Sequence, residues 1–188
     1  MNSSIIRAQD CPPQPWKNGL GTTREIAVHP SAASGNDFLW RVSIAEVDSA
    51  APFSSFPGID RHIVLLDGAG FTMTLDDGRM HALTTPYVPF AFPGEAKVAV
   101  TLADGPTRDF NLMVRRAQAR GEVKVWQTSG AFPLDPTVAL IYALRGEIDT
   151  DAGMLRAGDA WLAREPAAGH ISLRDGALAF AIAIKHMD

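Results

Sequence analysis

The sequence predicts an all-β protein. Its 16 glycines and 13 prolines are spread over 188 residues and divide the chain into segments too short for ordinary helices. Several segments alternate as strands do, for example Phe71, Met73 and Leu75 against Thr72 and Thr74. Short strands at such close spacing indicate a sandwich or a barrel.

The predicted strands follow from apolar alternation or from short apolar runs bounded by turn residues. In chain order they cover residues 23–28, 38–47, 63–66, 71–75, 98–102, 110–114, 124–127, 138–144, 160–164 and 178–184. Residues 114–120 are rich in Arg, Ala and Gln, and we expect a single helical turn there.

A faint internal repeat links the two halves of the chain. Residues 63–68 and 141–146 are each an apolar strand that ends in a glycine, and Gly68 and Gly146 lie 78 residues apart. Two related β-barrel units would explain the repeat. Chance is the alternative, because such apolar patterns before a glycine recur in β proteins.

Composition excludes several partners. With 17 basic and 21 acidic residues the net charge is −4, which gives no positive field for a phosphate backbone, so we expect no nucleic acid. The longest apolar runs, 138–144 and 177–184, fall well short of the roughly 18 residues of a membrane span. The start of the chain lacks the apolar stretch of a signal peptide. A single cysteine, Cys11, fits a reducing compartment, so we expect a cytoplasmic protein without a membrane partner.

The segment 15–25, PWKNGLGTTRE, is the first candidate binding element. An aromatic ring, a cation, an amide and a carboxylate accompany exposed backbone N–H groups, a set that suits a small polar or anionic molecule. A surface turn anchored by the tryptophan is the simpler alternative. The candidate residues are Trp16, Lys17, Asn18 and Glu25.

Two further segments place cations beside strands. In the strand 38–47, alternation puts Arg41 and Ser43 on the face opposite Trp40, Val42 and Ile44, and that polar face is either solvent or a pocket wall. Before the strand 63–66, Arg61 could grip a carboxylate and His62 could transfer a proton; a solvated turn is the alternative. Asn111 shares a strand face with Asp109, as a pocket residue or a strand-end residue.

Metal and nucleophilic chemistry have little support. No two of the five histidines stand at HxH or HxxxH spacing, although a site assembled from distant strands stays open. The sequence lacks GxSxG, and Cys11 has no identifiable base nearby. We therefore expect no metal and no cofactor.

Four blocks of the chain, in order, resemble the HutD/Ves family of small bacterial proteins. They are PWKNGLGTTREI, FLWRVSIAEV, FSSFPGIDRHIVLLDGAG and RDFNLMVRR, spread over residues 16–116. The resemblance implies a cupin-type fold of RmlC-like jelly-roll barrels with two units, a bicupin. We expect one unit at residues 1–116 with the ligand pocket and one at 117–188, with an approximate boundary that leaves room for exchanged strands. The sequence departs from the family's WKNGGG run at Leu20.

The resemblance also implies an association with histidine utilisation, as a regulator and not as a catalyst of one of its steps. The leading hypothesis is a non-enzymatic protein that binds a small anionic metabolite, with urocanate, formiminoglutamate and formylglutamate as candidates. Its pocket would use Trp16, Lys17, Asn18, Glu25, Arg41, Arg61, His62 and Asn111.

Two alternatives stay open. One is a cupin enzyme, an isomerase or hydrolase or else a metal-dependent oxygenase, with His62 as general acid or base held by Asp60 or Glu25. The other is an interaction module that dimerises or contacts a partner through apolar surface around Phe53, Phe56 and Phe90. A homodimer is compatible with each hypothesis.

Overall fold

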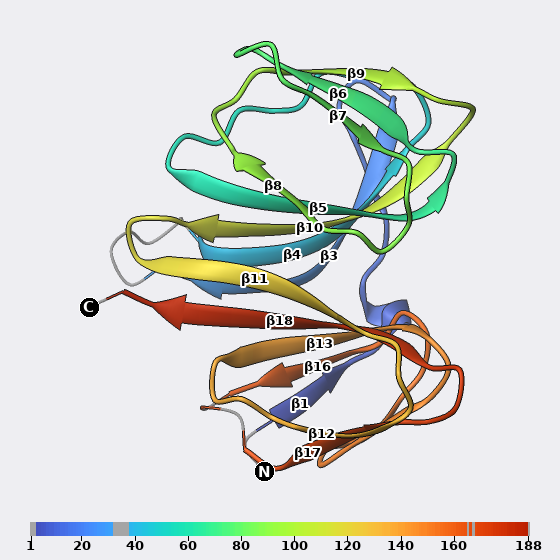
Figure 1. Ribbon diagram of the computed structural model, residues 1–188, viewed down its shortest axis with the longest axis vertical. Coiled ribbons are helices and arrows are strands. Elements are labelled where there is room, and N and C mark those ends of the chain that lie inside the picture. The colour runs from blue at the N-terminus through green and yellow to red at the C-terminus, as the bar shows by residue number, and fades with distance from the viewer. Residues whose placement is uncertain (1–2, 32–37, 165, 167, 188) are drawn as a thin grey trace. The chain divides into compact units, whose positions relative to one another are not determined.

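The computed structural model describes residues 3–31, 38–164, 166 and 168–187 (Figure 1). The chain forms two compact units. The N-terminal unit comprises residues 12–120 with residue 187, and the C-terminal unit comprises residues 3–11 and 121–186. Among the described residues, no helix is long and apolar enough to cross a membrane.

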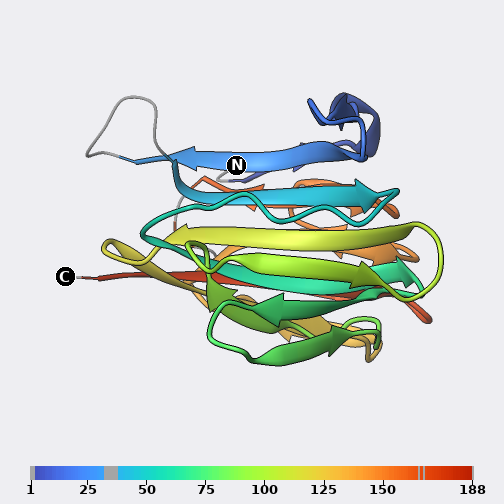
Figure 2. The same ribbon diagram turned by 90° about the horizontal axis from the view of Figure 1, so that it is seen from above.

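The N-terminal unit is built from two antiparallel sheets. The larger has the order β2-β3-β4-β10-β5-β8, and several of its strands run side by side in Figure 2. The smaller has the order β7-β6-β9. The strand bounds are β2 Gln14–Pro15, β3 Gly21–Pro30, β4 Phe38–Val47, β5 Ile59–Gly68, β6 Phe71–Leu75, β7 Met80–Leu83, β8 Phe90–Pro93, β9 Val98–Leu102 and β10 Thr107–Arg115.

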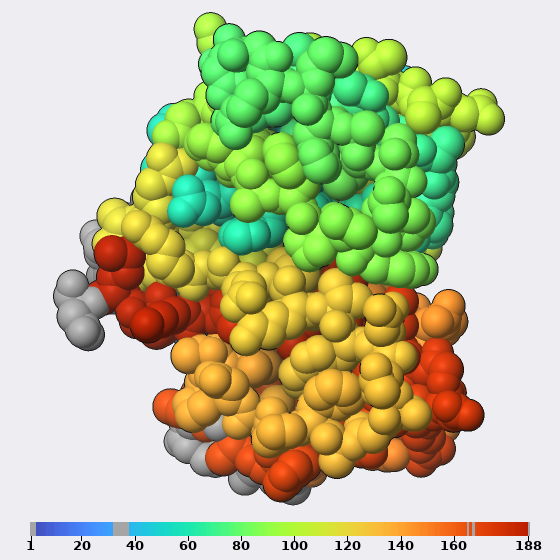
Figure 3. Space-filling model, in the orientation of Figure 1, coloured from blue at the N-terminus to red at the C-terminus, as the bar shows by residue number. Residues whose placement is uncertain are grey.

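Alternation decides which face of each sheet is buried. In β6, Phe71, Met73 and Leu75 are buried, whereas Thr72 and Thr74 point the other way and are more exposed. The apolar side chains of β6 join Ile63 and Leu65 of β5 in one core cluster. In Figure 3 the green side chains of the segment from β6 to β8 cover the face of this unit that is in view. The larger sheet thus has one face toward this core.

The C-terminal unit repeats the two-sheet plan. Its sheets have the orders β1-β16-β13-β18-β11 and β12-β17-β14-β15. A short 3-10 helix, η1 (Ala8–Asp10), follows β1. The strand bounds are β1 Ser3–Ile6, β11 Ala119–Trp126, β12 Gly130–Pro133, β13 Val138–Arg145, β14 Ile148–Thr150, β15 Gly153–Leu155, β16 Ala160–Ala163, β17 His170–Leu173 and β18 Leu178–His186.

The two units share one order of strand pairing. In the N-terminal unit β5 lies between β10 and β8, and β6 lies between β7 and β9. In the C-terminal unit β13 lies between β18 and β16, and β14 lies between β15 and β17. Gly68 ends β5 and Gly146 follows β13, and both have a positive φ, 90° and 75°. A side chain there would be strained and would also meet neighbouring backbone within 3 Å. The repeated glycine in the sequence therefore marks equivalent turns.

The structure corrects one expectation. The helical turn expected at 114–120 is wrong: β10 continues to Arg115, a turn follows in which the Gln118 N–H donates to the Arg115 carbonyl over 3.0 Å, and β11 begins at Ala119. The expected N-terminal unit began at residue 1 with room for exchanged strands, and β1 pairs with β16 in the C-terminal unit. The chain divides at residue 120, close to the expected 116.

Candidate functional site: a cationic cavity in the N-terminal unit

The N-terminal unit contains a cavity of about 490 Å³. Its wall combines one face of the larger sheet with two segments outside the strands, near residues 16–18 and 51–56. The charged and polar lining side chains are Lys17, Asn18, Thr23, Arg41, Ser43, Ser54, Arg61, Asp109 and Asn111. Three of these are cations and one is an acid, so the cavity favours an anionic occupant.

The structure shows whether the polar face of β4 meets solvent or a pocket. Arg41, Ser43, Ala45 and Val47 line the cavity, so the polar face of this strand is a pocket wall. The opposite face is buried as well, with Val42 fully buried.

Strands β5 and β10 supply the deepest polar groups. Arg61 is the register partner of Met113, and Ile63 is the partner of Asn111. Because side chains of paired residues share a face, these four line the same wall. Asp109 lies two residues before Asn111 and joins them.

Arg61 is a buried cation held in a fixed orientation. It is only 6% exposed, and its Nη2 donates to Asn111 Oδ1 over 2.8 Å. The guanidinium carbon lies 4.9 Å from the Phe53 ring centre and 5.0 Å from that of Phe92, within cation–π range. Its Nε has no hydrogen-bond partner among the described residues. Burial, with repulsion from Arg41, lowers the pKa of Arg61 to about 10, so the side chain stays charged at neutral pH.

Arg41 is the more accessible cation. Its Nε donates to Glu25 Oε2 over 2.8 Å, and its side chain is 23% exposed. Arg41 and Arg61 are close enough for their charges to repel, which is one reason that the pKa of Arg61 is lowered. An anion between two guanidinium groups relieves this repulsion and satisfies their free N–H groups.

The segment around Trp16 forms one rim of the cavity. The Trp16 indole N–H donates to Thr23 Oγ1 over 2.7 Å, and the Trp16 backbone N–H donates to the Gly21 carbonyl over 2.9 Å. Asn18 Oδ1 accepts from the Leu20 backbone N–H over 3.1 Å. These bonds fix the ring and leave Lys17 exposed at the rim, where its charge can meet an incoming anion.

Asp109 is the charged lining residue that the sequence analysis left out of the site. It is 1% exposed and lines the cavity, yet neither carboxylate oxygen has a hydrogen-bond partner among the described residues. The single hydroxyl proton of Thr107 is directed to the Asp67 carbonyl, at 3.3 Å. Burial raises the pKa of Asp109 to about 7; the nearby Thr107 hydroxyl and the charge of Arg61 oppose this shift, and the charge of Asp67 adds to it. The sequence signal for Asp109 was its position two residues before Asn111, which places both side chains on one face of the strand.

The structure brings six of the eight candidate residues into the lining. Glu25 is not among the lining residues and acts on the cavity through its bond to Arg41. His62 is not among them either, because alternation places it on the opposite face of β5 from Arg61. The six lining candidates are Trp16, Lys17, Asn18, Arg41, Arg61 and Asn111.

The phenylalanines considered for a partner surface have other contacts. Phe53 and Phe56 are partly buried, line the cavity and lie beside the guanidinium of Arg61. Phe90 stacks on His81, with ring centres 3.7 Å apart. These contacts assign Phe53 and Phe56 to the cavity.

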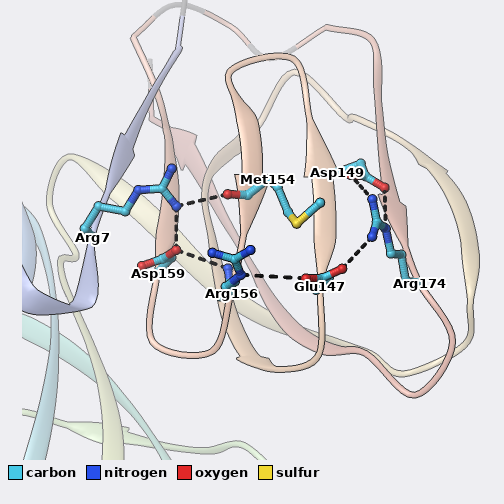
Figure 4. A network of polar contacts seen from close by, with 7 residues as sticks. All are labelled: Arg7, Glu147, Asp149, Met154, Arg156, Asp159 and Arg174. Atoms are coloured by element: carbon cyan, nitrogen blue, oxygen red, sulfur yellow. Dashed lines mark hydrogen bonds and ion pairs between the residues drawn. The ribbon is translucent and has the colours of Figure 1, made fainter.

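A second polar cluster lies in the C-terminal unit. Arg7 Nη1 donates to Asp159 Oδ2 over 2.6 Å and to the Met154 carbonyl over 3.0 Å, and Asp159 also accepts from the backbone N–H groups of Ala8 and Arg156. The contacts continue through Arg156, Glu147, Arg174 and Asp149 (Figure 4). Acids and bases alternate and pair within the cluster, so it acts as a tether for the segment after β1. In the part of the chain that the structure describes, no three His, Cys, Asp or Glu side chains are arranged to hold a metal ion.

Comparison with known proteins supports the fold. The chain is 34% identical over 145 residues to a Pseudomonas putida protein described as an uncharacterized 21.2 kDa protein in the hutC 3′ region. The matched stretch covers 77% of this chain and 75% of that protein. It is 42% identical over 111 residues to Protein Ves of Cronobacter sakazakii, covering 58% of this chain and 59% of that protein.

Solved structures agree with this. The structure of HutD from Pseudomonas fluorescens SBW25 matches with a TM-score of 0.85 and 31% identity, covering 99% of this chain and all of that one. A cupin 2 conserved barrel domain protein from Leptotrichia buccalis matches with a TM-score of 0.56 and 8% identity over 89% of each chain, which shows the cupin-type fold alone. The HutD family model matches residues 8–180. The chain therefore belongs to the HutD family.

Proposed function

We propose that the chain is a non-enzymatic binding protein for a small carboxylate metabolite, which it holds in the cavity of the N-terminal unit. The observation that carries the proposal is Arg61, a charged guanidinium that is 6% exposed, oriented by Asn111 and left with an unpaired Nε. An unsatisfied buried donor costs about 1–3 kcal/mol or more when it is charged. A carboxylate oxygen of the ligand accepts a hydrogen bond from this donor, which removes the cost, and pairs with the charge of the guanidinium.

The size and charge of the cavity support the same ligand class. About 490 Å³ lies within the range of small-molecule sites. Lys17, Arg41 and Arg61 outweigh Asp109 in the lining, which suits one or two carboxylates. Urocanate, formiminoglutamate and formylglutamate are the candidate ligands, since all carry such groups. A role as regulator of histidine utilisation is part of the proposal, and the name of the Pseudomonas putida relative supports it by its reference to the hutC region.

Binding is tested by thermal unfolding with each of the three candidate ligands and with glutarate, in the presence of a chelator. A ligand at about 100 times its dissociation constant adds about 2.7 kcal/mol to the free energy of unfolding. We expect one or more candidates to stabilise the protein without added metal. If none does so even at millimolar concentration, the proposal is wrong.

The matched variants are Arg41→Ala and Arg24→Ala. Arg24 lies on β3, outside the cavity lining, and pairs with Glu46 at 3.6 Å. Loss of one charged contact weakens binding about tenfold or more. We expect that loss for Arg41→Ala only. Equal affinities for the two variants would remove Arg41 from the site.

The enzyme alternative assigned acid–base chemistry to His62, which lies on the other face of β5. Each candidate ligand is therefore also incubated with the protein and followed by chromatography. We expect every one to be recovered unchanged. Turnover would replace the binding proposal with a catalytic one.

A further inference from the structure

Asp109 is a buried acid that the proposed anion site does not by itself explain. Its side chain faces a cavity that attracts anions, and its two oxygens have no hydrogen-bond partner among the described residues. An ionised carboxylate in this position repels an incoming carboxylate. A protonated one offers an O–H donor to it.

Several elements pack around Asp109, and some of them contribute charged groups. On β5, Arg61 is attractive and Asp67 is repulsive. On β4, Arg41 lines the same wall but pairs with Glu25 of β3. The segment at 51–56 contributes apolar and hydroxyl side chains to the lining, and the rim contributes Lys17.

Resting on the proposed function, we propose that binding of a carboxylate in this cavity takes up one proton on Asp109, whose protonated carboxyl then donates a hydrogen bond to the ligand. The ligand carboxylate keeps its charge for Arg61 and Arg41. The proton comes from solvent and remains on a carboxyl oxygen of Asp109, so charge balances without another reactant. Asp109 is thus a binding residue that works in its neutral form.

The pKa of Asp109 sets the pH range in which ligand binding is coupled to proton uptake. Because burial raises its pKa to about 7 in the free protein, Asp109 is largely protonated below that pH, and affinity is then independent of pH. A bound anion raises the pKa further. Between the free and the bound pKa each molecule of ligand brings in a proton, so affinity falls up to about tenfold for each unit that the pH rises above about 7.

The test is isothermal titration calorimetry with N-formyl-L-glutamate and with glutarate as probes, from about pH 6 to about pH 9, where the carboxylates of both stay ionised. Repeating each titration in HEPES and in Tris, which differ in ionisation enthalpy and are not small anions, counts the protons taken up. We expect uptake that approaches one proton near pH 8. No histidine is among the lining residues that the structure describes, so the histidines do not supply this signal by direct contact.

Asp109→Asn is the matched variant, because its amide supplies an N–H donor at every pH. We expect it to bind the same probe with no proton uptake and an affinity independent of pH. Wild-type binding without uptake, or an unchanged pH slope in Asp109→Asn, would overturn the inference and leave the proposed function standing.

A measurement on the ligand-free protein tests the raised pKa of Asp109 whether or not a probe binds. Carboxyl carbon NMR of the folded protein follows Asp109 directly, and we expect a midpoint near 7. A midpoint near 4, the value for an exposed aspartate, overturns the inference whether or not either probe binds. If neither probe binds, the titrations are repeated with urocanate and formiminoglutamate; if none of these ligands binds at any pH, the proposed function fails, and the inference fails with it.

Discussion

Arg61 Nη2 donates to Asn111 Oδ1 over 2.8 Å across the neighbouring strands β5 and β10. The bond fixes the guanidinium plane inside the cavity and uses one of its five N–H groups. The aromatic rings of Phe53, Phe56 and Phe92 lie around the same group. A cation oriented in this way is prepared for a ligand before the ligand arrives, which reduces the loss of side-chain freedom on binding.

Arg61→Met should weaken anion binding and keep the fold. Methionine retains the apolar stem and packs among the phenylalanines, whereas the charge and the N–H donors are lost. Hydrogen bonds to charged groups contribute about 1.5–3 kcal/mol, so we expect affinity to fall about 10- to 150-fold. Calorimetry gives the affinity, and far-ultraviolet circular dichroism checks the fold.

Arg79→Met is the control for that change. Arg79 pairs with Asp77 in an exposed turn and is not among the lining residues. We expect its affinity to equal that of the wild type. A folded Arg61→Met that binds as well as Arg79→Met would exclude Arg61 as an anion contact.

Asp109 should make the protein less stable as the pH rises from about 4 to about 7. Its pKa is raised in the folded state, from 3.8 to about 7, so between these values the folded state holds a proton that the unfolded state has lost. This stabilisation is complete below the unfolded pKa and disappears as the pH passes the folded pKa, at about 1.4 kcal/mol per pH unit.

Urea unfolding of wild type and Asp109→Asn at several pH values measures this effect. Asparagine does not titrate, so we expect the difference between the two free energies of unfolding to favour the variant increasingly from about pH 4 to about pH 7. A difference that is constant over this range would show that Asp109 titrates normally.

Trp16 should report ligand binding by fluorescence. Its ring lines the cavity and is fixed by the 2.7 Å bond from its indole N–H to Thr23. We expect a bound ligand to change the emission of the wild type and of Trp126→Phe, since Trp126 stacks on Phe132 in the C-terminal unit. The change should be lost in Trp16→Phe, provided that calorimetry still detects binding. A signal that persists there would come from another tryptophan.

The strands were predictable where apolar alternation is regular. The bounds expected for 38–47, 71–75 and 98–102 are those of β4, β6 and β9. Short edge strands such as β7 and β15 were missed, because three or four residues carry too little periodicity and their pairing depends on distant partners. Residues 114–120 have helix-forming composition, but β10 and β11 pair into sheets on either side, and tertiary pairing prevailed over local preference.

The cations of the site were predictable from the sequence, but which face of each strand meets the cavity was less so. Arg41 stands out as a charge within a predicted apolar strand, and Arg61 as a charge just before one. His62 was grouped with Arg61 by closeness in sequence, but neighbouring residues of a strand point to opposite faces, and only the register of β5 against β10 shows which face meets the cavity. Glu25 was grouped with the segment around Trp16; it is the register partner of Ser43 and contacts Arg41, but it is not among the lining residues. Asp109 needed the same information, because its burial is set by strands distant in sequence.

The tether between Arg7 and Asp159 should contribute to stability through the carboxylate more than through the arginine. Asp159 accepts the backbone N–H groups of Ala8 and Arg156 at 3.0 and 3.1 Å, as well as the Arg7 guanidinium at 2.6 Å. Burial acts to raise the pKa of Asp159, but these donors outweigh it and lower the pKa below its ordinary value. We expect Asp159→Ala to cost about 1–3 kcal/mol of unfolding free energy, because two backbone donors lose their partner.

Arg7→Ala removes only a half-exposed ion pair, with the arginine side chain 44% exposed, and should cost about 1 kcal/mol or less. The lowered pKa also sets the sign of the pH effect. The carboxylate's contribution is present above the unfolded pKa of 3.8 and is lost as the pH falls through the folded value, so wild type and Asp159→Ala should converge in stability only in acid. Urea unfolding from about pH 7 down to about pH 3 measures both effects. A larger loss for Arg7→Ala than for Asp159→Ala would show that the salt bridge, and not the backbone capping, holds this segment.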